Sequence, residues 1–582
     1  MASAMTQIFG AAQAALDRSR RFRATDLALV AAVPAAVFAV VRLAQQWTGT
    51  LRPTTEIDLS LRALPGYAAL SLSRGLAAYA LSLGFTLVYG YWAAKDRVAE
   101  RVLIPALDIL QSIPVLSFMP GLVLGLVALF PHSNAGLELA SVIMIFTGQA
   151  WNMTFSFYHA LRSIPRDLTE VATLNRFGWW QRFRWVELPF SAIGLVWNSM
   201  MSMAGGWFFL MVSEAFVLGD HDFRLPGLGA YMSVAVARGD GRAMAAAVAA
   251  MTLMIVALDQ LLWRPVVVWA QKFRVEESGQ TEAMESWFLD VLRRSRILPW
   301  LGARAHALGA LPSEWLRRRA EAARAHPPRP HSRTANRASA LLFAALLALL
   351  AAGAVGLVHL LRPIGGSTWL SIAGAAVLTL LRVLAATALG TAWALPAGLA
   401  IGLSPRLSRV LQPIVQVVAS FPAPMLFPAV VAVLTAAGVG LGTGSVVLML
   451  LGTQWYVLFN VVAGATAIPA DLREAARLYR MPLWQRFRAL YLPAVFPYLV
   501  TGWVTAAGGA WNASIVSEYV AFRGTVLSTH GLGARISLAA SAGDFSALAA
   551  SSTVMALMVV LFNRVVWRRL HRVAEERFSL AR

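Results

Sequence analysis

Two similar charged segments hold the side chains with the clearest chemical potential. One reads EVATLNRFGWWQRFRWVELP, from Glu170 to Pro189, and the other reads EAARLYRMPLWQRFRALYLP, from Glu474 to Pro493. Both are rich in arginine and are flanked by long apolar runs. A glutamate followed by several arginines can form ion pairs and charge-assisted hydrogen bonds with another protein. The pattern therefore favours docking over bond-breaking chemistry.

Each segment also has the signals of a helix–turn–helix. In IPADLREAARLYR, Asp471 precedes Glu474 by three residues, which predicts an N-cap side chain followed by an acid in the first turn. The segment that begins IPRDLTEVATLNR repeats this spacing. About two turns later, the dipeptide MP in one copy and FG in the other interrupts the helix. The alternative is a lipid-facing loop with snorkelling arginines, but two copies at equivalent places favour a docking element.

Ionisable side chains inside apolar runs are the second group of candidates. A buried charge in a membrane is costly, so such residues mark function or ion pairs. Glu214 and Glu518 end equivalent apolar runs, and Arg74 and Arg382 occupy equivalent positions that can neutralise them. A carboxylate repels an anion, so we expect a structural ion pair or gate in each half rather than a substrate ligand.

Polar and aromatic side chains inside the spans are candidates for a solute pathway or a gate. A small solute on a pseudo-symmetry axis need not be symmetric, so positions that differ between the halves are the better specificity candidates. The tryptophans form narrow walls in one interpretation and pack between helices in the other. Besides the four ionisable residues above, the candidates are Gln149, Asn152, Trp207, Ser213, Gln454, Tyr456, Trp511, Asn512 and Ser517.

Membrane spans are the elements that position these residues. The chain has 582 residues, of which 58% are hydrophobic and only 14% charged, against about 25% charged in soluble domains. Apolar stretches of about 20 residues recur along the whole length, and each can cross a bilayer as a helix. The net charge of +21 comes from arginines between these stretches. The positive-inside rule explains them better than nucleic-acid binding does.

We predict about twelve spans, six in each half. Arginine-rich loops alternate with less basic ones, which puts both termini and both charged segments in the cytoplasm. The halves therefore have the same orientation, as two parallel units related by a pseudo-two-fold axis along the membrane normal. The predicted spans are 27–46, 71–93, 102–130, 137–160, 188–218, 243–263, 339–361, 376–402, 410–435, 445–464, 492–518 and 546–563.

The halves also match residue by residue. RVLIPALDILQSIPVLSFMP at 101–120 corresponds to RVLQPIVQVVASFPAPMLFP at 409–428, and GLG at 227–229 corresponds to GLG at 531–533. Gene duplication and fusion is the economical explanation. The prolines and glycines of these segments either break or kink the third span of each half.

The repeat divides the chain into five parts. The middle part contains HPPRPHSR, and such proline-rich, charged composition is typical of a tether. The expected parts are an N-terminal cytoplasmic segment (1–26), a first transmembrane domain (27–264), a cytoplasmic linker rich in Arg and Pro (265–337), a second transmembrane domain (338–564) and a cytoplasmic tail (565–582).

Energy-coupling chemistry is not predicted for the chain itself. It has no cysteine, and its lysines Lys95 and Lys272 are not in a GxxxxGK[ST] context, so no P-loop is present. The sequence also lacks an HExxH motif and a His/Cys metal cluster. We expect no catalytic residue, no metal site and no cofactor in this chain.

The charged segments resemble the EAA coupling loop of ABC importer permeases, the inner-membrane components of binding-protein-dependent transport systems. Glu474-Ala475-Ala476 matches the motif, and Glu170-Val171-Ala172 matches it with one change. The family usually has glycine six residues after the glutamate, where this chain has Arg176 and Arg480. The start of the second span, the third span and the SE…GLG end of the fifth resemble the nitrate/sulfonate/taurine branch.

The resemblance implies an all-α polytopic protein made of two fused type I importer permease units in a bacterial inner membrane. It implies two nucleotide-binding subunits that use ATP and Mg, an extracytoplasmic solute-binding protein, and a small solute such as nitrate, a sulfonate, taurine or bicarbonate. An ion-gradient-driven secondary transporter is the alternative, and it leaves the duplicated loop unexplained. A membrane-embedded enzyme lacks a clustered His/Asp/Glu site. The coupling residues that the resemblance implies are Asp167, Glu170, Ala172, Arg176, Gly178, Asp471, Glu474, Ala475, Ala476 and Arg480.

Overall fold

The structure is a computed structural model of the chain. It describes residues 56–218, 221–273, 286–294, 351–522 and 524–578, with the short stretches 45–47 and 348. The predicted N-terminal segment, nearly all of the span at 27–46, most of the linker and part of the span at 339–361 lie outside the described residues. Contacts divide the chain into two compact units. Unit 1 comprises Met1–Gln46, Ser163–Val196 and Ala257–Val355, and unit 2 comprises Trp47–Arg162, Trp197–Val256 and Gly356–Arg582.

Helices dominate the first half of the chain. Several are joined without a break through a short π-helical stretch, so the predicted second span runs from Leu64 to Lys95. The elements are α3 (Leu64–Phe85), η1 (Thr86–Gly90), α4 (Tyr91–Lys95), α5 (Arg97–Ser112), α6 (Val115–Leu129), α7 (Ala135–Arg162), α8 (Arg166–Leu174), α9 (Trp179–Arg182), η2 (Phe183–Glu187), α10 (Leu188–Ser213), α11 (Leu228–Arg238), α12 (Gly241–Leu258), η3 (Asp259–Trp263), α13 (Arg264–Ala270), η4 (Gln271–Phe273) and α14 (Trp287–Arg294).

The second half repeats this order. The long helix α17 covers the region of the predicted span 376–402 and extends ten residues further at its start. The elements are α17 (Gly366–Leu403), α18 (Pro405–Ser420), η5 (Ala423–Leu426), α19 (Phe427–Ala436), α20 (Leu441–Thr466), α21 (Ala470–Leu478), α22 (Leu483–Arg486), η6 (Phe487–Tyr491), α23 (Leu492–Ser517), α24 (Leu532–Ser541), α25 (Phe545–Phe562), η7 (Asn563–Trp567) and α26 (Arg568–Phe578).

The described residues contain several helices that can cross a membrane, but fewer than the twelve spans that the sequence predicts. Seven described helices are long and apolar enough to cross a membrane, or eight if one bent pair counts as a single span. The sequence predicted about twelve. The described part therefore confirms the multi-pass character and leaves the count of twelve a prediction.

The third span of each half is broken, which is one of the two outcomes predicted from its prolines and glycines. In the first half α5 ends at Ser112, and α6 begins after Pro114, whose extended backbone is incompatible with a continuous helix. In the second half α18 and the following helical segment meet at 81° across Phe421 and Pro422. The prolines therefore break the span rather than only bend it.

The fifth span of the first half ends earlier than predicted, that of the second half ends as predicted to within one residue, and a short β-hairpin follows each. Helix α10 ends at Ser213, and strands β1 (Ala215–Leu218) and β2 (His221–Arg224) then pair antiparallel, with Ala215 opposite Arg224. In the second half α23 ends at Ser517. Strands β3 (Tyr519–Phe522) and β4 (Thr525–Ser528) pair in the same way. The described part of the chain is thus mostly helical, with two β-hairpins that the sequence did not predict.

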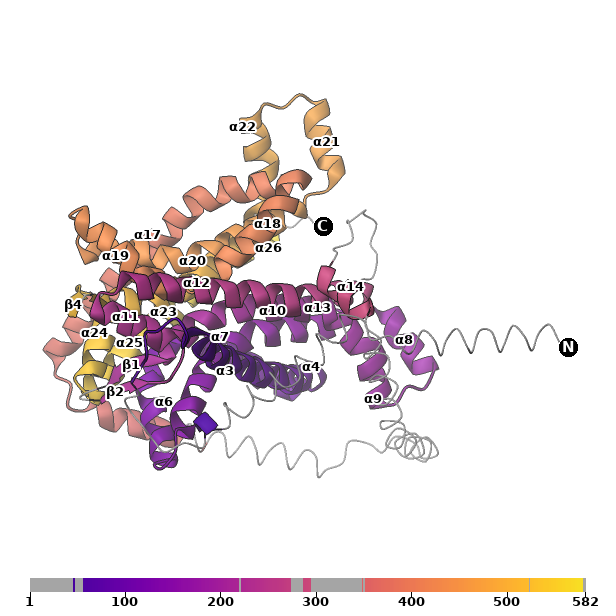
Figure 1. Cartoon of the computed structure of the whole chain (residues 1–582). Helices are drawn as coiled ribbons and strands as arrows, with labels where there is room; N and C mark the ends of the chain where they lie inside the picture. Colours follow the sequence, from indigo (N-terminus) through magenta and orange to yellow (C-terminus); the bar gives the residue numbers. More distant parts are fainter. Residues whose placement is uncertain are drawn as a thin grey trace. The chain divides into compact units, whose positions relative to one another are not determined.

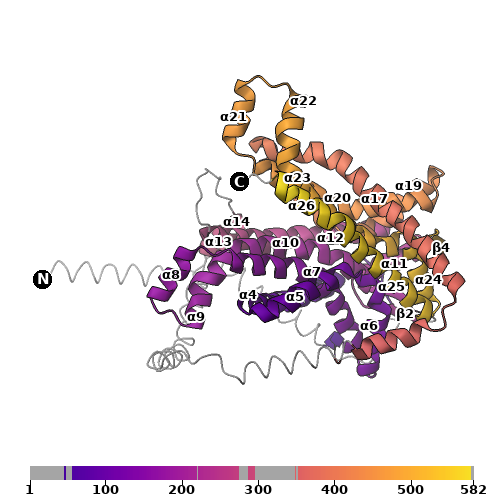
Figure 2. The ribbon, with the colours of Figure 1, turned by 180° about the vertical axis from the view of Figure 1, so that it is seen from behind.

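Small residues let the helices of unit 2 approach closely. Helices α17, α20 and α23 pack side by side (Figures 1 and 2) around a core that includes Val457, Val461 and Leu499. A Cβ atom on Gly398 of α17 would lie 2.6 Å from Val461. Close approach at small residues is the usual way in which membrane helices pack, so the core of this half sits between these three helices.

Candidate functional site

The second charged segment forms the predicted helix, turn and second helix. Helices α21 and α22 make a helical hairpin that projects from the end of α20 and α23 (Figure 1). Ala476 is buried against the turn, whereas Glu474 is exposed. The predicted N-cap side chain was wrong: Pro469 is the N-cap, and Asp471 lies in the first turn, where it complements the helix dipole.

The first charged segment, which lies in unit 1, has the same local structure. Pro165 is the N-cap of α8, Asp167 lies in the first turn, and Ala172 is the buried residue of the helix. Here too no side chain caps the helix, because the N-cap residue is a proline, whose side chain has no hydrogen-bond acceptor. The side chain of Glu170 is again exposed.

An arginine in left-handed conformation ends each of these two helices. Arg176 and Arg480 both have φ of 49°, and they are the only non-glycine residues of the described part with positive φ. In α8 the N–H of Arg176 donates to Thr173 (2.9 Å), and that of Phe177 donates to Ala172 (2.9 Å). Met481 repeats the second bond to Ala476 at 3.1 Å. This is a Schellman motif, whose left-handed position favours glycine. The arginines thus stand where the resembled family usually has glycine because that position needs positive φ.

Both hairpins present apolar side chains to the outside. Leu174 and Leu478, at the last position of each helix, are 81% and 83% exposed, and Trp179 and Leu483 are 64% and 78% exposed. Leucines exposed at the same place in two short polar helices are unusual for a surface without a partner. Each hairpin therefore combines an exposed glutamate, exposed arginines and an apolar tip.

A buried ion cluster lies where α10 ends in the first half. Arg74 contacts Glu138 through two bonds, Nε–Oε2 (2.6 Å) and Nη2–Oε1 (2.7 Å), and its Nη1 contacts Glu214 Oε1 (2.8 Å). Ser71 donates to the same Glu214 oxygen (2.6 Å), and the Gly229 N–H donates to the other (2.7 Å). All three charged side chains are fully buried. The predicted pairing of Arg74 with Glu214 is confirmed.

The second half builds a related cluster at the end of α23. Arg382 Nη1 donates to Glu518 (2.7 Å) and to the His530 carbonyl (2.8 Å). Thr379 takes the place of Ser71 and donates to Glu518 (2.9 Å), as does the Gly533 N–H (2.9 Å). The predicted pair of Arg382 and Glu518 is also confirmed. Gating by either pair stays a prediction.

The GLG repeats are explained by these carboxylates. A Cβ atom on Gly227 would lie 2.3 Å from the carboxylate of Glu214, and one on Gly531 would lie 2.1 Å from that of Glu518. Each glycine therefore leaves the space that the glutamate fills.

Three members of the clusters were missed by the sequence reasoning: Glu138, Ser71 and Thr379. Glu138 lies near the start of a predicted span, so an acid in an apolar run was the available signal. The offset of 304 residues that relates Glu214 to Glu518 relates Glu138 to Gly442, and the comparison of the halves therefore passed over it.

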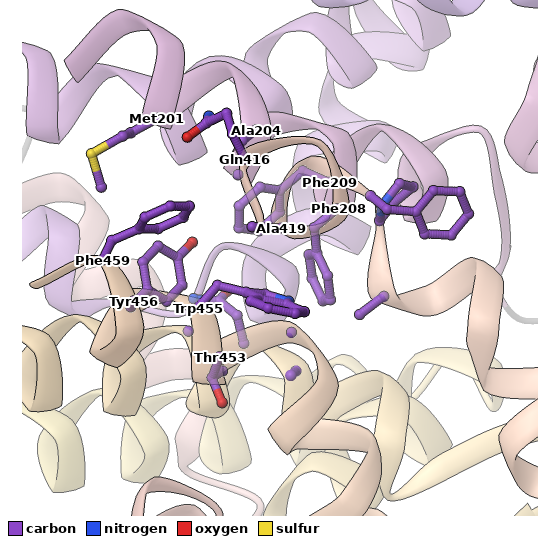
Figure 3. A pocket seen from close by; sticks show the side chains of 18 residues that line it. Met201, Ala204, Phe208, Phe209, Gln416, Ala419, Thr453, Trp455, Tyr456 and Phe459 are labelled. Atoms are coloured by element: carbon purple, nitrogen blue, oxygen red, sulfur yellow. The ribbon is translucent and has the colours of Figure 1, made fainter. Parts of the chain in front are cut away.

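A cavity of about 90 Å³ lies in unit 2, between the second part of α10 and elements of the second half. Figure 3 shows the rings of Phe208, Trp455, Tyr456 and Phe459 gathered around it. No residue of its lining carries a charge; the polar groups come from Gln416, Thr453, Tyr456 and Asn512.

The broken spans contribute to this cavity. Phe421, Pro422 and Ala423, at the break of the second half, line it directly. Asn512 lines it as well, and its Oδ1 accepts a hydrogen bond (2.8 Å) from the N–H of Val115 at the break of the first half. Breaks at membrane depth are tolerated where another group satisfies the backbone or where they line a cavity.

Other pathway candidates lie away from the cavity. Trp207 is buried and packs on α3, where a Cβ atom on Gly75 would lie 2.9 Å from its ring; Trp511 is also buried. Gln149 is buried beside Ser82 and Met203, and Gln454 accepts from the Trp393 indole (3.0 Å). Of the remaining candidates, Asn152 is exposed, Ser213 bonds Ser141 (2.7 Å), and the buried Ser517 hydroxyl has no partner in the described part.

The chain matches one protein family twice. The family is described as "Binding-protein-dependent transport system inner membrane component", and the matched residues are 86–262 and 390–578. These segments together cover more than half of the chain and fall one in each half. They contain both helical hairpins and the carboxylates of both ion clusters.

Curated relatives are similar to parts of the chain. The Bicarbonate transport system permease protein CmpB of Synechococcus elongatus is 28% identical over 155 residues, 27% of this chain and 52% of the relative. The Taurine transport system permease protein TauC of Escherichia coli is 27% identical over 199 residues (33% and 67%). The Riboflavin transport system permease protein RibX of Chloroflexus aurantiacus is 30% identical over 179 residues (30% and 62%). The chain spans about half to two thirds of the length of these relatives.

Proposed function

Because the chain belongs to the family of binding-protein-dependent transport system inner membrane components, we propose that it is the complete membrane pathway of an ATP-driven importer. It is an ABC permease with two fused units, a non-enzymatic component that lies in the inner membrane. Each half presents its helical hairpin to one ATPase subunit on the cytoplasmic side, and ATP and Mg bind to those subunits. A solute-binding protein delivers the solute to the opposite side.

The observation that carries the proposal is the exposed surface shared by the two hairpins. Glu170 and Glu474 project beside leucines that are more than 80% exposed. Burying one such leucine against a partner contributes about 2 kcal/mol, and the arginines add charge-assisted hydrogen bonds. In the second half, α23 runs directly from the hairpin to the ion cluster. Its 26 residues span about 39 Å, so movement of the hairpin is transmitted along one rigid helix.

We propose that the solute is a small anion. Relatives that carry bicarbonate and taurine support this class, and the riboflavin relative is the competing outcome. The cavity offers an amide, hydroxyls and indole and phenol groups rather than a fixed charge. A neutral, partly polar lining binds a solute weakly enough to release it, as a pathway requires.

Reconstitution with the ATPase and the solute-binding protein in proteoliposomes tests the proposal. We expect uptake of labelled solute only when ATP and both partners are present. Glu170→Ala combined with Glu474→Ala is expected to lower uptake at least about tenfold, which corresponds to about 1.4 kcal/mol of lost coupling. Arg406→Ala is the matched control, since it removes an exposed charge from the first turn of α18, outside the helical hairpins.

Two outcomes would contradict the proposal. One is unchanged uptake by the double variant. The other is robust uptake by the chain alone in ATP-free vesicles under an ion gradient, which would make it a secondary transporter. Competition by nitrate, bicarbonate, taurine, an alkanesulfonate and riboflavin identifies the solute class in the same assay.

A further inference from the structure

The ion cluster of the second half has the donors of the first but one carboxylate fewer. In the first half the Nε–Nη2 edge of Arg74 holds both oxygens of Glu138. Gly442 occupies the equivalent position in the second half and has no side chain, so no carboxylate is available there. The same edge of Arg382 instead has the Gly442 carbonyl at 3.0 Å and the Thr529 hydroxyl at 3.2 Å.

A side chain at position 442 has room for its first atom. A Cβ atom on Gly442 would meet only Thr529 Oγ1 at 3.6 Å and Arg382 Nη2 at 4.0 Å, both ordinary contact distances. The direction in which a side chain at position 442 starts is therefore open and leads toward the Arg382 guanidinium.

Solvent reaches this arginine but not its counterpart. The side chain of Arg382 is 13% exposed, whereas that of Arg74 is 0% exposed. His530 and Thr443 beside it are also exposed. Within the described residues, Nη2 of Arg382 donates one bond, to Thr529, and has a second N–H, while the Thr529 hydroxyl accepts that bond and can donate its own hydrogen. A guanidinium N–H beside a hydroxyl donor at a partly exposed position suits a small oxyanion.

We propose that Arg382 and Thr529 form a binding site for a small free oxyanion, such as bicarbonate, nitrate or a sulfonate. The anion accepts from Nη2 of Arg382 and from the Thr529 hydroxyl, beside the edge that in the first half is held by the Glu138 carboxylate. The site lies in the second half of the chain, at the end of the spans that is predicted to face the outside. It therefore receives the solute before the aromatic-lined cavity does. The existence of the site does not depend on transport, but its assignment to the transported solute rests on the proposed function.

Arginine labelling of the full chain in lipid nanodiscs tests the site without any partner. Phenylglyoxal modifies accessible arginines, and mass spectrometry gives the rate at Arg382, with Arg406 as an exposed internal control. Sodium bicarbonate, nitrate or methanesulfonate is expected to slow labelling of Arg382 at least about threefold relative to chloride at equal ionic strength. Labelling of Arg406 stays unchanged.

Variants at position 442 separate anion binding from general effects. Gly442→Glu restores the carboxylate of the first half and is expected to remove the anion-dependent protection. Gly442→Ala leaves the space and keeps the protection. Gly442→Gln serves if the glutamate variant does not fold, because its neutral amide fills the space and is expected to remove the protection as well.

Three results would overturn the proposal. The first is equal labelling of Arg382 in oxyanion and in chloride. The second is equal protection in Gly442→Ala and in Gly442→Glu or Gly442→Gln. The third comes from a further sample to which solute-free binding protein is added: protection by that protein but not by any free anion. The last result assigns the arginine to docking. The labelling experiment contains no ATPase and is therefore independent of transport. Anion protection in that experiment, together with no ATP-driven uptake in the proteoliposome assay, would refute the proposed function and leave the site intact.

Discussion

The two halves are alike at their helical hairpins, α8–α9 and α21–α22, and unlike at their ion clusters. Arg176 and Arg480 share the same φ of 49°, and the leucines two residues before them are exposed to the same extent. Arg74, by contrast, is fully buried between two carboxylates, whereas Arg382 is partly exposed beside one. If each helical hairpin docks on one ATPase subunit, as we propose, both copies must be kept, whereas a solute has no symmetry to match. The difference shows that the helical hairpins stayed alike in the two halves while the ion clusters diverged.

Replacement of the two cluster arginines tests this comparison with the largest expected effect. Arg74→Met leaves two buried carboxylates without a counter-charge and is expected to cost about 4 kcal/mol. Arg382→Met leaves one buried carboxylate without a counter-charge, beside a position that solvent already reaches, and is expected to cost about half as much. Thermal unfolding of each purified variant measures the order, and equal losses would remove the distinction between the clusters.

The GLG glycines provide the next largest effect and should act alike in both halves. Gly227→Ala or Gly531→Ala places a methyl group within 2.3 Å of a carboxylate, and we expect each to cost about 2–3 kcal/mol through overpacking. Gly508→Ala is the matched control, because nothing lies within 4 Å of its Cβ position. A lowered melting temperature for the control but not for the other two would contradict the packing assigned to the clusters.

The apolar tips of the hairpins should matter for coupling and not for stability. Leu174→Asp and Leu478→Asp put a charge where a partner would bury leucine, so we expect each to reduce ATP-driven uptake by about tenfold, or about 1.4 kcal/mol. The melting temperature of the isolated chain should stay the same, since both side chains are exposed. Uptake that falls for one leucine only would break the equivalence of the hairpins.

The smallest effect is expected at the left-handed arginines. Arg480→Gly relieves a conformation that costs an L-residue about 1 kcal/mol but adds freedom to the unfolded chain, so the melting temperature should change little. Arg480→Val places a β-branched residue at positive φ and should lower stability by about 1 kcal/mol. Parallel changes at Arg176 are expected, and a stabilising valine would contradict the Schellman geometry.

Sequence reasoning recovered what the repeat and local periodicity encode. The hairpins follow from the spacing of Asp471, Glu474 and Pro482, and the pairing of Arg74 with Glu214 follows from two costly charges inside apolar runs. The N-cap was assigned to an aspartate because capping preferences alone do not reveal that Pro469 is already fixed in extended conformation.

Features that depend on tertiary contacts were not recovered. Glu138 has no counterpart in the second half, so the comparison of the halves passed over it, and its 2.6 Å contact with Arg74 identifies its role. The β-hairpins β1–β2 and β3–β4 contain four-residue strands. The apolar residues of β1 were assigned to the end of the preceding span, and β3 was not predicted at all. The positive φ of Arg480 could not be predicted from its residue type, because arginine has no preference for positive φ. A glycine at this position would have indicated it.

Cross-linking from the hairpin tips tests the central claim most directly. The chain contains no cysteine, so Leu174→Cys and Leu478→Cys each provide a unique thiol for a short cross-linker in inner-membrane vesicles that contain the ATPase. The account predicts that both variants cross-link to an ATPase subunit on the cytoplasmic side. It is contradicted if neither thiol cross-links, or if an impermeant reagent reaches either one from the outer face.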